Sequence, residues 1–177
     1  MSQSVSAPTP DQIASQIIAA DPTQSVWVGA NAGTGKTRVL ITRILRLLLE
    51  GVPATQILCL TFTKAAAAEM ANRLSHQLGA WAFIPNDELI SELTQMIGRK
   101  PELSVIRTAR QLFAQTLDTP GGLKIRTIHS FCESLLGCFP IEANVAPHFS
   151  VVDERTANEL RLEARDHLMC RAGSGEN

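Results

Sequence analysis

A glycine-containing loop near the N-terminus restricts the possible folds more than any other feature of this 177-residue sequence. It lies between an apolar segment at residues 25–29 and an amphipathic segment at residues 36–50, and its residues are Ala30, Asn31, Ala32, Gly33, Thr34, Gly35, Lys36 and Thr37. The first segment favours a short buried strand and the second a helix. A loop in this position turns backbone N–H groups inward, and the helix N-terminus adds positive potential. The sequence therefore predicts a phosphate-binding loop.

The residue types in the loop match the chemistry of a nucleoside triphosphate. Gly33 and Gly35 lack the Cβ atoms that would block the close approach of phosphates. Lys36 supplies a point charge for the β- and γ-phosphates, and Thr37 offers a hydroxyl to Mg²⁺, so these two residues are the catalytic candidates. Arg38 follows them among the nucleotide-binding candidates. Ala30 stands where the strict pattern has glycine, but alanine there needs only an ordinary backbone angle.

Composition limits the partners and the compartment. The formal net charge is −1, so a nucleic acid must be held by a local patch or by stacking rather than by a global basic field. The four cysteines form no CxxC pair, and His129 with Cys132 is only half of a zinc pattern. Unpaired cysteines fit a reducing compartment. No apolar run reaches the roughly 20 residues that span a bilayer, and no signal peptide precedes the first helix. We expect a cytoplasmic protein without a membrane partner.

The order of segments predicts an α/β fold. A strand at 25–29, a helix at 36–50 and a strand at 57–62 form a βαβ unit, whose strands are parallel. Residues 1–8 have the composition of a disordered segment, with Thr9 as a cap for the first helix, and residues 172–177 resemble a frayed tail. Further helices are expected at 10–20, 65–78, 87–97, 102–117, 130–138 and 154–170, and further strands at 123–128 and 149–152.

Polar and aromatic residues follow the second expected strand. Thr61, Phe62, Thr63 and Lys64 lie at its carboxyl end, which is where ligands bind in open parallel sheets. An exposed Phe62 stacks on a base with about 1–3 kcal/mol, and Thr63 and Lys64 hold phosphate oxygens. Alternatively Phe62 lies in the core and Lys64 is solvated. Both interpretations stay open on composition.

Two later segments carry weaker signals. Thr127, His129 and Ser130 repeat the arrangement at a third strand end, where His129 either contacts nucleic acid or is an ordinary structural histidine. Asp153 and Glu154 follow a short apolar stretch. They are either Mg²⁺ carboxylates or the start of a helix, where Asp153 caps and Glu154 suits the dipole.

Four segments in this order resemble motifs of the UvrD/Rep-like superfamily-one DNA helicases, and most closely the AddA/RecB branch. From the N-terminus they are residues 9–12, the phosphate loop at 30–37, residues 60–70 and residues 127–131. The resemblance implies that Gln12 reads the adenine and that Thr61, Phe62, Thr63, Lys64, Thr127, His129 and Ser130 contact DNA. Lys64-Ala65 departs from the Asn-Lys that many UvrD-type members carry.

The resemblance also implies an architecture and a role. Residues 9–153 would be the N-terminal part of a RecA-like P-loop NTPase domain, incomplete, with a helical insertion at about 79–120, and residues 154–177 the start of a helical subdomain. The family role would be that of an ATP- and Mg²⁺-dependent 3′-to-5′ helicase. It would act on single-stranded and duplex DNA in double-strand break repair, with an AddB-like second subunit. This chain alone is expected to be inactive. A small P-loop kinase and a non-catalytic nucleotide- or DNA-binding fragment remain as alternatives.

Overall fold

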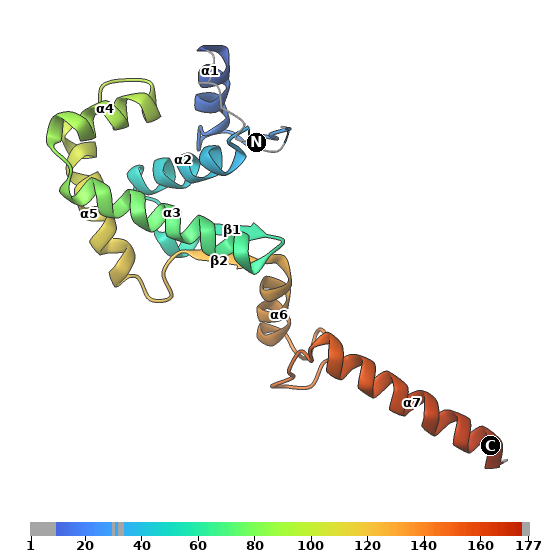
Figure 1. Ribbon diagram of the computed structural model, residues 1–177. Coiled ribbons are helices and arrows are strands. Elements are labelled where there is room, and N and C mark those ends of the chain that lie inside the picture. The colour runs from blue at the N-terminus through green and yellow to red at the C-terminus, as the bar shows by residue number, and fades with distance from the viewer. Residues whose placement is uncertain (1–9, 30, 32–33, 175–177) are drawn as a thin grey trace. The chain divides into compact units, whose positions relative to one another are not determined.

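The computed structural model describes residues 10–29, 31 and 34–174 (Figure 1). The side chains of residues 10–13 and 174 are outside this description. The expectations for residues 1–8, the Thr9 cap, Ala30, Ala32, Gly33 and residues 175–177 therefore fall outside the described residues. The chain divides into two compact units, Met1–Ile128 and His129–Asn177, which are described separately below.

The first unit contains most of the helices and both strands. Its elements are α1 (Pro10–Ala19), α2 (Lys36–Leu49), the short 3₁₀ helix η1 (Ala54–Gln56), β1 (Leu58–Thr61), α3 (Lys64–Phe83), α4 (Asn86–Ile97), α5 (Leu103–Asp118) and β2 (Lys124–Thr127). These elements agree with the expected helices at 10–20, 36–50, 87–97 and 102–117 and the expected strands at 57–62 and 123–128, within a few residues at each end. Helix boundaries vary by this much between assignments.

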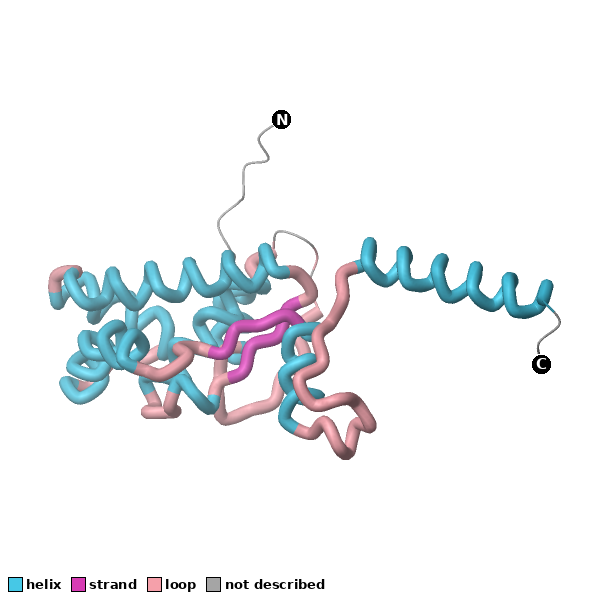
Figure 2. Tube along the Cα trace, turned by 90° about the horizontal axis from the view of Figure 1, so that it is seen from below, coloured by secondary structure: helices cyan, strands magenta, loops and turns pink. Residues whose placement is uncertain are grey.

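The sheet consists of β1 and β2, paired in parallel (Figure 2). The register places Leu58 opposite Lys124 and Thr61 opposite Thr127, so both strands end at the same edge. Helices α3, α4 and α5 form the connection between the strands, as a parallel pair requires. The α/β class with a parallel sheet is therefore confirmed.

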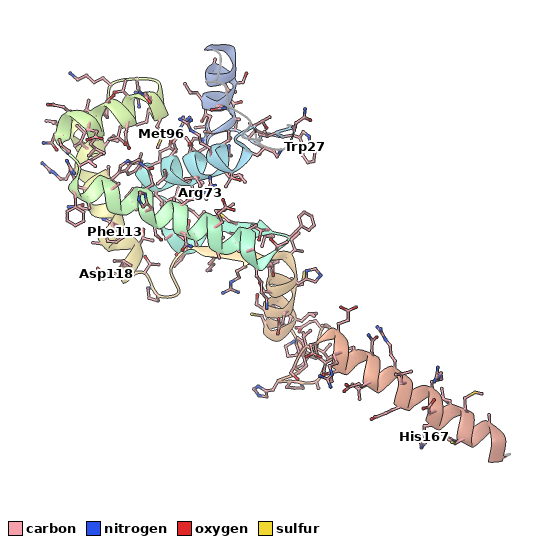
Figure 3. The ribbon with its side chains drawn as sticks, in the orientation of Figure 1. Trp27, Arg73, Met96, Phe113, Asp118 and His167 are labelled. Atoms are coloured by element: carbon pink, nitrogen blue, oxygen red, sulfur yellow. The ribbon has the colours of Figure 1, made fainter. Side chains whose placement is uncertain are left out.

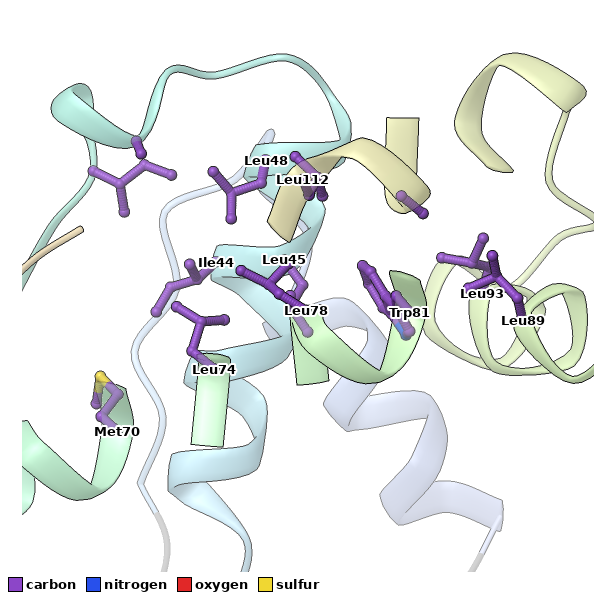
Figure 4. Packing of buried hydrophobic residues seen from close by; sticks show 13 residues of the cluster. Ile44, Leu45, Leu48, Met70, Leu74, Leu78, Trp81, Leu89, Leu93 and Leu112 are labelled. Carbon is purple, nitrogen blue, oxygen red and sulfur yellow. The ribbon is translucent and has the colours of Figure 1, made fainter. Parts of the chain in front are cut away.

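The core of this unit lies between α2, α3, α4 and α5 (Figure 4). Its largest fully buried side chains are Leu45, Leu74, Leu78, Trp81, Leu89 and Leu93. The indole Nε1 of Trp81 donates to the Glu92 carboxylate at 2.8 Å, and the Gln77 side-chain amide donates to the same oxygen at 2.8 Å. A buried indole N–H needs such an acceptor, so Glu92 fixes α4 against α3.

The strand predicted at residues 25–29 is wrong. The segment has no regular structure, and its apolar side chains, Val26, Trp27 and Val28, are exposed, with Trp27 at 96%. Figure 3 shows Trp27 pointing away from α2. A strand needs a neighbour for its backbone hydrogen bonds, and within the described residues the sheet contains only β1 and β2. An apolar segment such as residues 25–29 does not form a strand unless a neighbouring strand pairs with its backbone.

Helix α3 extends beyond the segment expected at 65–78. It continues through Gly79 to Phe83, although glycine often ends a helix. A Cβ at Gly79 would lie 3.6 Å from the ring of Phe113, which is an ordinary van der Waals distance, so the packing of α5 on α3 does not itself require glycine here. Tertiary packing of Leu78 and Trp81 carries the helix past this residue.

The second unit contains α7 (Glu154–Ser174) and nearly all of α6 (Ile128–Cys138). The strand predicted at 149–152 is wrong, since Val151 and Val152 are exposed in irregular backbone. Residues 172–174 belong to α7 rather than to a frayed tail, although glycine, here Gly173, often ends a helix. None of the helices in the described part of the chain has the length and apolar character needed to cross a membrane.

Candidate functional site

The phosphate loop leads directly into α2. Gly35 is the residue before the helix, with φ 89° and ψ 16°. This left-handed conformation favours glycine. The first N–H groups of a helix have no partner within it, and no side chain caps this end of α2. Gly35 therefore presents the start of α2 in the form that suits an anion.

Lys36 is the first residue of α2 and turns back over the loop. Its Nζ donates to the carbonyl oxygen of Asn31 at 2.6 Å, and the hydroxyl of Thr34 donates to the same oxygen at 2.7 Å. Thr37 is half-buried and Arg38 is exposed. The structure thus places Asn31, Thr34, Gly35, Lys36 and Thr37 at one helix end.

Helix α1 approaches this loop with a glutamine that no sequence motif singled out. The side-chain Nε2 of Gln16 lies 3.8 Å from the position that a Cβ on Gly35 would occupy. Gln12 lies one turn earlier in α1, and residues four apart share a helix face. The side chain of Gln12 is outside the described residues, so its contact with adenine stays a prediction.

Two arginines of α2 hold the end of α1 and the segment after it. Arg43 Nη1 donates to the carbonyl oxygen of Asp21 at 2.6 Å, and Nη2 donates to that of Gln24 at 2.6 Å. Arg46 Nη1 donates to the carbonyl oxygen of Ile17 at 3.0 Å. Cations that satisfy the last carbonyls of a helix stabilise it. We call Arg43 and Arg46 the arginine clamp.

A turn of the chain completes the clamp. The backbone N–H and the hydroxyl of Thr23 donate to the Asp21 carboxylate at 2.9 and 2.7 Å. These two bonds lower the pKa of Asp21, with smaller contributions from Arg46 and Arg43. The sequence signal that was missed is an arginine inside an apolar helical stripe: Arg43 is four residues from both Val39 and Leu47.

Phe62 and its neighbours lie at the carboxyl end of β1. Phe62 is 83% exposed, so the core alternative for this residue is wrong. The Thr63 hydroxyl accepts a hydrogen bond from the Ala66 N–H at 3.1 Å and caps α3, and the Thr61 hydroxyl donates to the Thr63 carbonyl at 3.0 Å. Lys64 is exposed at the first position of α3. A phenyl ring and a cation therefore reach solvent beside a helix N-terminus.

The remaining candidates lie at the end of β2 and in the second unit. Thr127 is buried at the end of β2, and in the first turn of α6 His129 is exposed and Ser130 half-buried. Asp153 accepts a hydrogen bond from the Thr156 N–H at 2.7 Å, which lowers the pKa of Asp153. This is the helix cap that one of the two alternatives for Asp153 predicts. The described residues contain no group of three side chains suited to a metal ion.

Comparison with known proteins gives a consistent result. The model of the UvrD/REP helicase N-terminal domain family matches residues 11–171. Several similar proteins are named as the A subunit of an ATP-dependent helicase/nuclease. The one from Lactobacillus johnsonii is 33% identical over 144 residues, 81% of this chain and 10% of the relative. The one from Lactobacillus gasseri is 34% identical over 143 residues, with coverage of 81% and 10%. The one from Moorella thermoacetica is 32% identical over 171 residues, with coverage of 95% and 10%.

Proposed function

Since this chain belongs to the UvrD/REP helicase N-terminal domain family, we propose that it is the ATP-binding part of a RecA-like P-loop motor domain. One observation carries the proposal. Gly35, in a left-handed conformation, ends the loop at an uncapped helix N-terminus, and Lys36 reaches back over that loop to Asn31. An incoming phosphate replaces the Asn31 carbonyl as the partner of the Lys36 ammonium, because a charged acceptor binds it more strongly than a neutral one.

The nucleotide contacts divide between phosphates, metal and base. The loop, residues 30–37, and Arg38 surround the phosphates. Thr37 offers its hydroxyl to Mg²⁺, which when bound neutralises charge on the phosphates. A single protein ligand suits this ion, which keeps several waters and takes phosphate oxygens as further ligands. Gln12 contacts the adenine, because an amide both donates and accepts hydrogen bonds.

Single-stranded DNA is the proposed second ligand of the domain. The exposed ring of Phe62 supplies a stacking surface. Thr61, Thr63, Lys64 and the first turn of α3 supply donors for phosphate oxygens. Thr127, His129 and Ser130, in the segment 127–131, are further proposed contacts with the DNA.

A wider role rests on the relatives, of which this chain spans 10% in length. Their printed name describes one subunit of an ATP-dependent helicase/nuclease. We propose that the corresponding longer protein unwinds duplex DNA with 3′-to-5′ polarity in double-strand break repair, together with a second, AddB-like subunit. No feature of the described part of the first unit favours a small kinase, since the Thr61–Lys64 segment has no task in that reaction.

The test is a titration of the chain with MgATP, followed by the fluorescence of Trp27. Of the two tryptophans, Trp27 is 96% exposed near the loop, whereas Trp81 is fully buried. Lys36→Ala should weaken binding about tenfold to a hundredfold, because hydrogen bonds to charged groups contribute about 1.5–3 kcal/mol. Lys100→Ala, at an exposed site, is the control and should bind normally. Equal affinity in the Lys36→Ala and wild-type chains would refute the proposal.

A further inference from the structure

We propose that Gln16 is a further nucleotide-binding residue, whose side-chain amide contacts the phosphate groups held by the loop. The proposal rests on the proposed function, since it assumes that a nucleotide binds at the start of α2. It names the phosphates, rather than the base, as the part of the ligand that this residue contacts.

The position of Gln16 is the first argument. Its side-chain Nε2 lies 3.8 Å from where a Cβ on Gly35 would stand, so the amide faces the residue that opens α2. Gln16 is half-buried. An amide nitrogen carries two N–H groups, and at this place they can donate to a phosphate oxygen.

The rigidity of that position is the second argument. The Arg46 guanidinium donates to the carbonyl oxygen of Ile17, the residue next to Gln16, at 3.0 Å. Arg43 binds the carbonyl oxygens of Asp21 and Gln24. Because both arginines belong to α2, the arginine clamp ties α1 to the same helix that begins at Lys36, directly after Gly35. Gln16 is thus placed by groups that need no ligand, and such preorganised contacts cost little entropy on binding.

The third argument is the kind of side chain that lies beside Gly35. Among the described atoms outside residues 34–36, Gln16 Nε2 is the closest to a Cβ at Gly35, at an ordinary van der Waals distance. A polar amide, rather than an apolar side chain, therefore borders the uncapped end of α2. In a site that binds anions at a helix N-terminus, a neutral donor at this place adds a hydrogen bond without adding charge.

The experiment introduces a negative or a positive charge at position 16, where the wild type has a neutral amide. In the MgATP titration, Gln16→Glu should weaken binding about tenfold, and Gln16→Lys should strengthen it by a similar factor, since a unit charge close to the phosphates acts directly on them. The effect should decrease from ATP to ADP to AMP. A merely structural role would make both variants weaker. Ser15→Glu is the matched control, because it adds the same charge at an exposed site one residue away and should change affinity less than about twofold.

The arginine clamp provides a second measurement. Arg43→Gln should reduce the difference between Gln16→Glu and Gln16→Lys, because α1 is then held less firmly over the loop. If Gln16→Glu and Gln16→Lys bind MgATP like the wild type while Lys36→Ala binds it more weakly, the inference is wrong and the proposed function stands. If Lys36→Ala binds like the wild type, or the wild type does not bind at all, the proposed function itself fails.

Discussion

Phe62 is a large apolar side chain that the fold leaves almost fully in water. It follows β1 directly and precedes the Thr63 cap of α3, so the backbone on both sides of it is held in place. A fixed aromatic ring beside Lys64 and a helix N-terminus suits a stacked base whose phosphate lies within reach. At the scale of single residues, this is the most specific argument for a DNA contact.

Phe62→Ala should therefore weaken oligo-dT binding by about 1–3 kcal/mol, since that is the contribution of one stacked base. The slope of log affinity against log salt should stay the same, because stacking neutralises no phosphate; each phosphate neutralised contributes about −0.7. Fluorescence anisotropy at several salt concentrations measures both. Phe83→Ala is the control. Phe83 is 86% exposed, much like Phe62, but it is the last residue of α3, at the opposite end of the helix from Phe62. Normal binding by the Phe62→Ala chain would rule out stacking.

The position of Gly35 and Lys36 at the start of a helix was predictable from sequence, because it follows from local chain geometry. Gly35 and Lys36 are adjacent, and the loop-to-helix junction alone fixes what they can do. Gln16 and Arg43 were not predictable in this way. Gln16 lies beside Gly35, 19 positions away in the sequence, and Arg43 binds the carbonyl oxygen of Asp21, 22 positions away, and a single sequence does not reveal which helix faces meet.

At the scale of elements, two part-buried hydrogen bonds to one carboxylate join α3 and α4. The Glu92 carboxylate accepts from both Gln77 and Trp81, and Trp81 is 0% exposed. The Arg110 guanidinium adds a second connection, since it donates to the Trp81 carbonyl oxygen and to Asn86, at 2.7 Å each. The position of α4 therefore depends on a few hydrogen bonds in addition to the packing of Leu89 and Leu93.

Glu92→Ala should lower the free energy of unfolding by about 1–3 kcal/mol, because the buried Trp81 N–H is left without an acceptor. Glu92→Gln keeps a carbonyl oxygen at the same place and should cost less. Urea unfolding followed by tryptophan fluorescence compares the variants. An Ala variant as stable as the wild type would show that water or another group satisfies the indole.

The elements themselves were predictable where periodicity and end signals agreed. Helices α2, α4 and α5 carry regular apolar positions and lie close to their expected ranges. The segments at 25–29 and 149–152 were not, because their apolar residues indicate strands only if a neighbouring strand pairs with them. The end of α3 was missed because the burial of Leu78 and Trp81, rather than Gly79, decides how far the helix continues.

At the scale of the whole molecule, the chain joins a unit that carries the proposed nucleotide site to a second unit with a long exposed helix. The side chains of α7 from Asn158 to Gly173 are exposed, and the helix begins with the Asp153 cap. The family match runs through both units, at residues 11–171. Binding and turnover are separate properties of such a chain, because hydrolysis also needs a Mg²⁺ carboxylate, a group that orients water and usually an arginine at the γ-phosphate.

This chain alone should bind MgATP but release phosphate far more slowly than about 1 s⁻¹, the lower end of the usual enzyme range. The reason is that Asp153, the candidate carboxylate, already accepts a hydrogen bond as the cap of α7. A steady-state phosphate assay with and without oligo-dT tests this. Turnover at or above about 1 s⁻¹ that is abolished by Asp153→Asn would mean that Asp153 is a metal ligand after all.

The central claim is that the start of α2 binds the phosphates of a nucleotide. Amide chemical-shift mapping with ¹⁵N-labelled chain and MgADP tests it most directly, because it reports on the N–H groups of Gly35, Lys36 and Thr37 themselves. We predict that these amides shift most and saturate together, and that the amides of Gly35 and Thr37 shift far less in the Lys36→Ala chain at an MgADP concentration that half-saturates the wild type. Saturating shifts confined to other elements, with these three amides unaffected, would contradict the account.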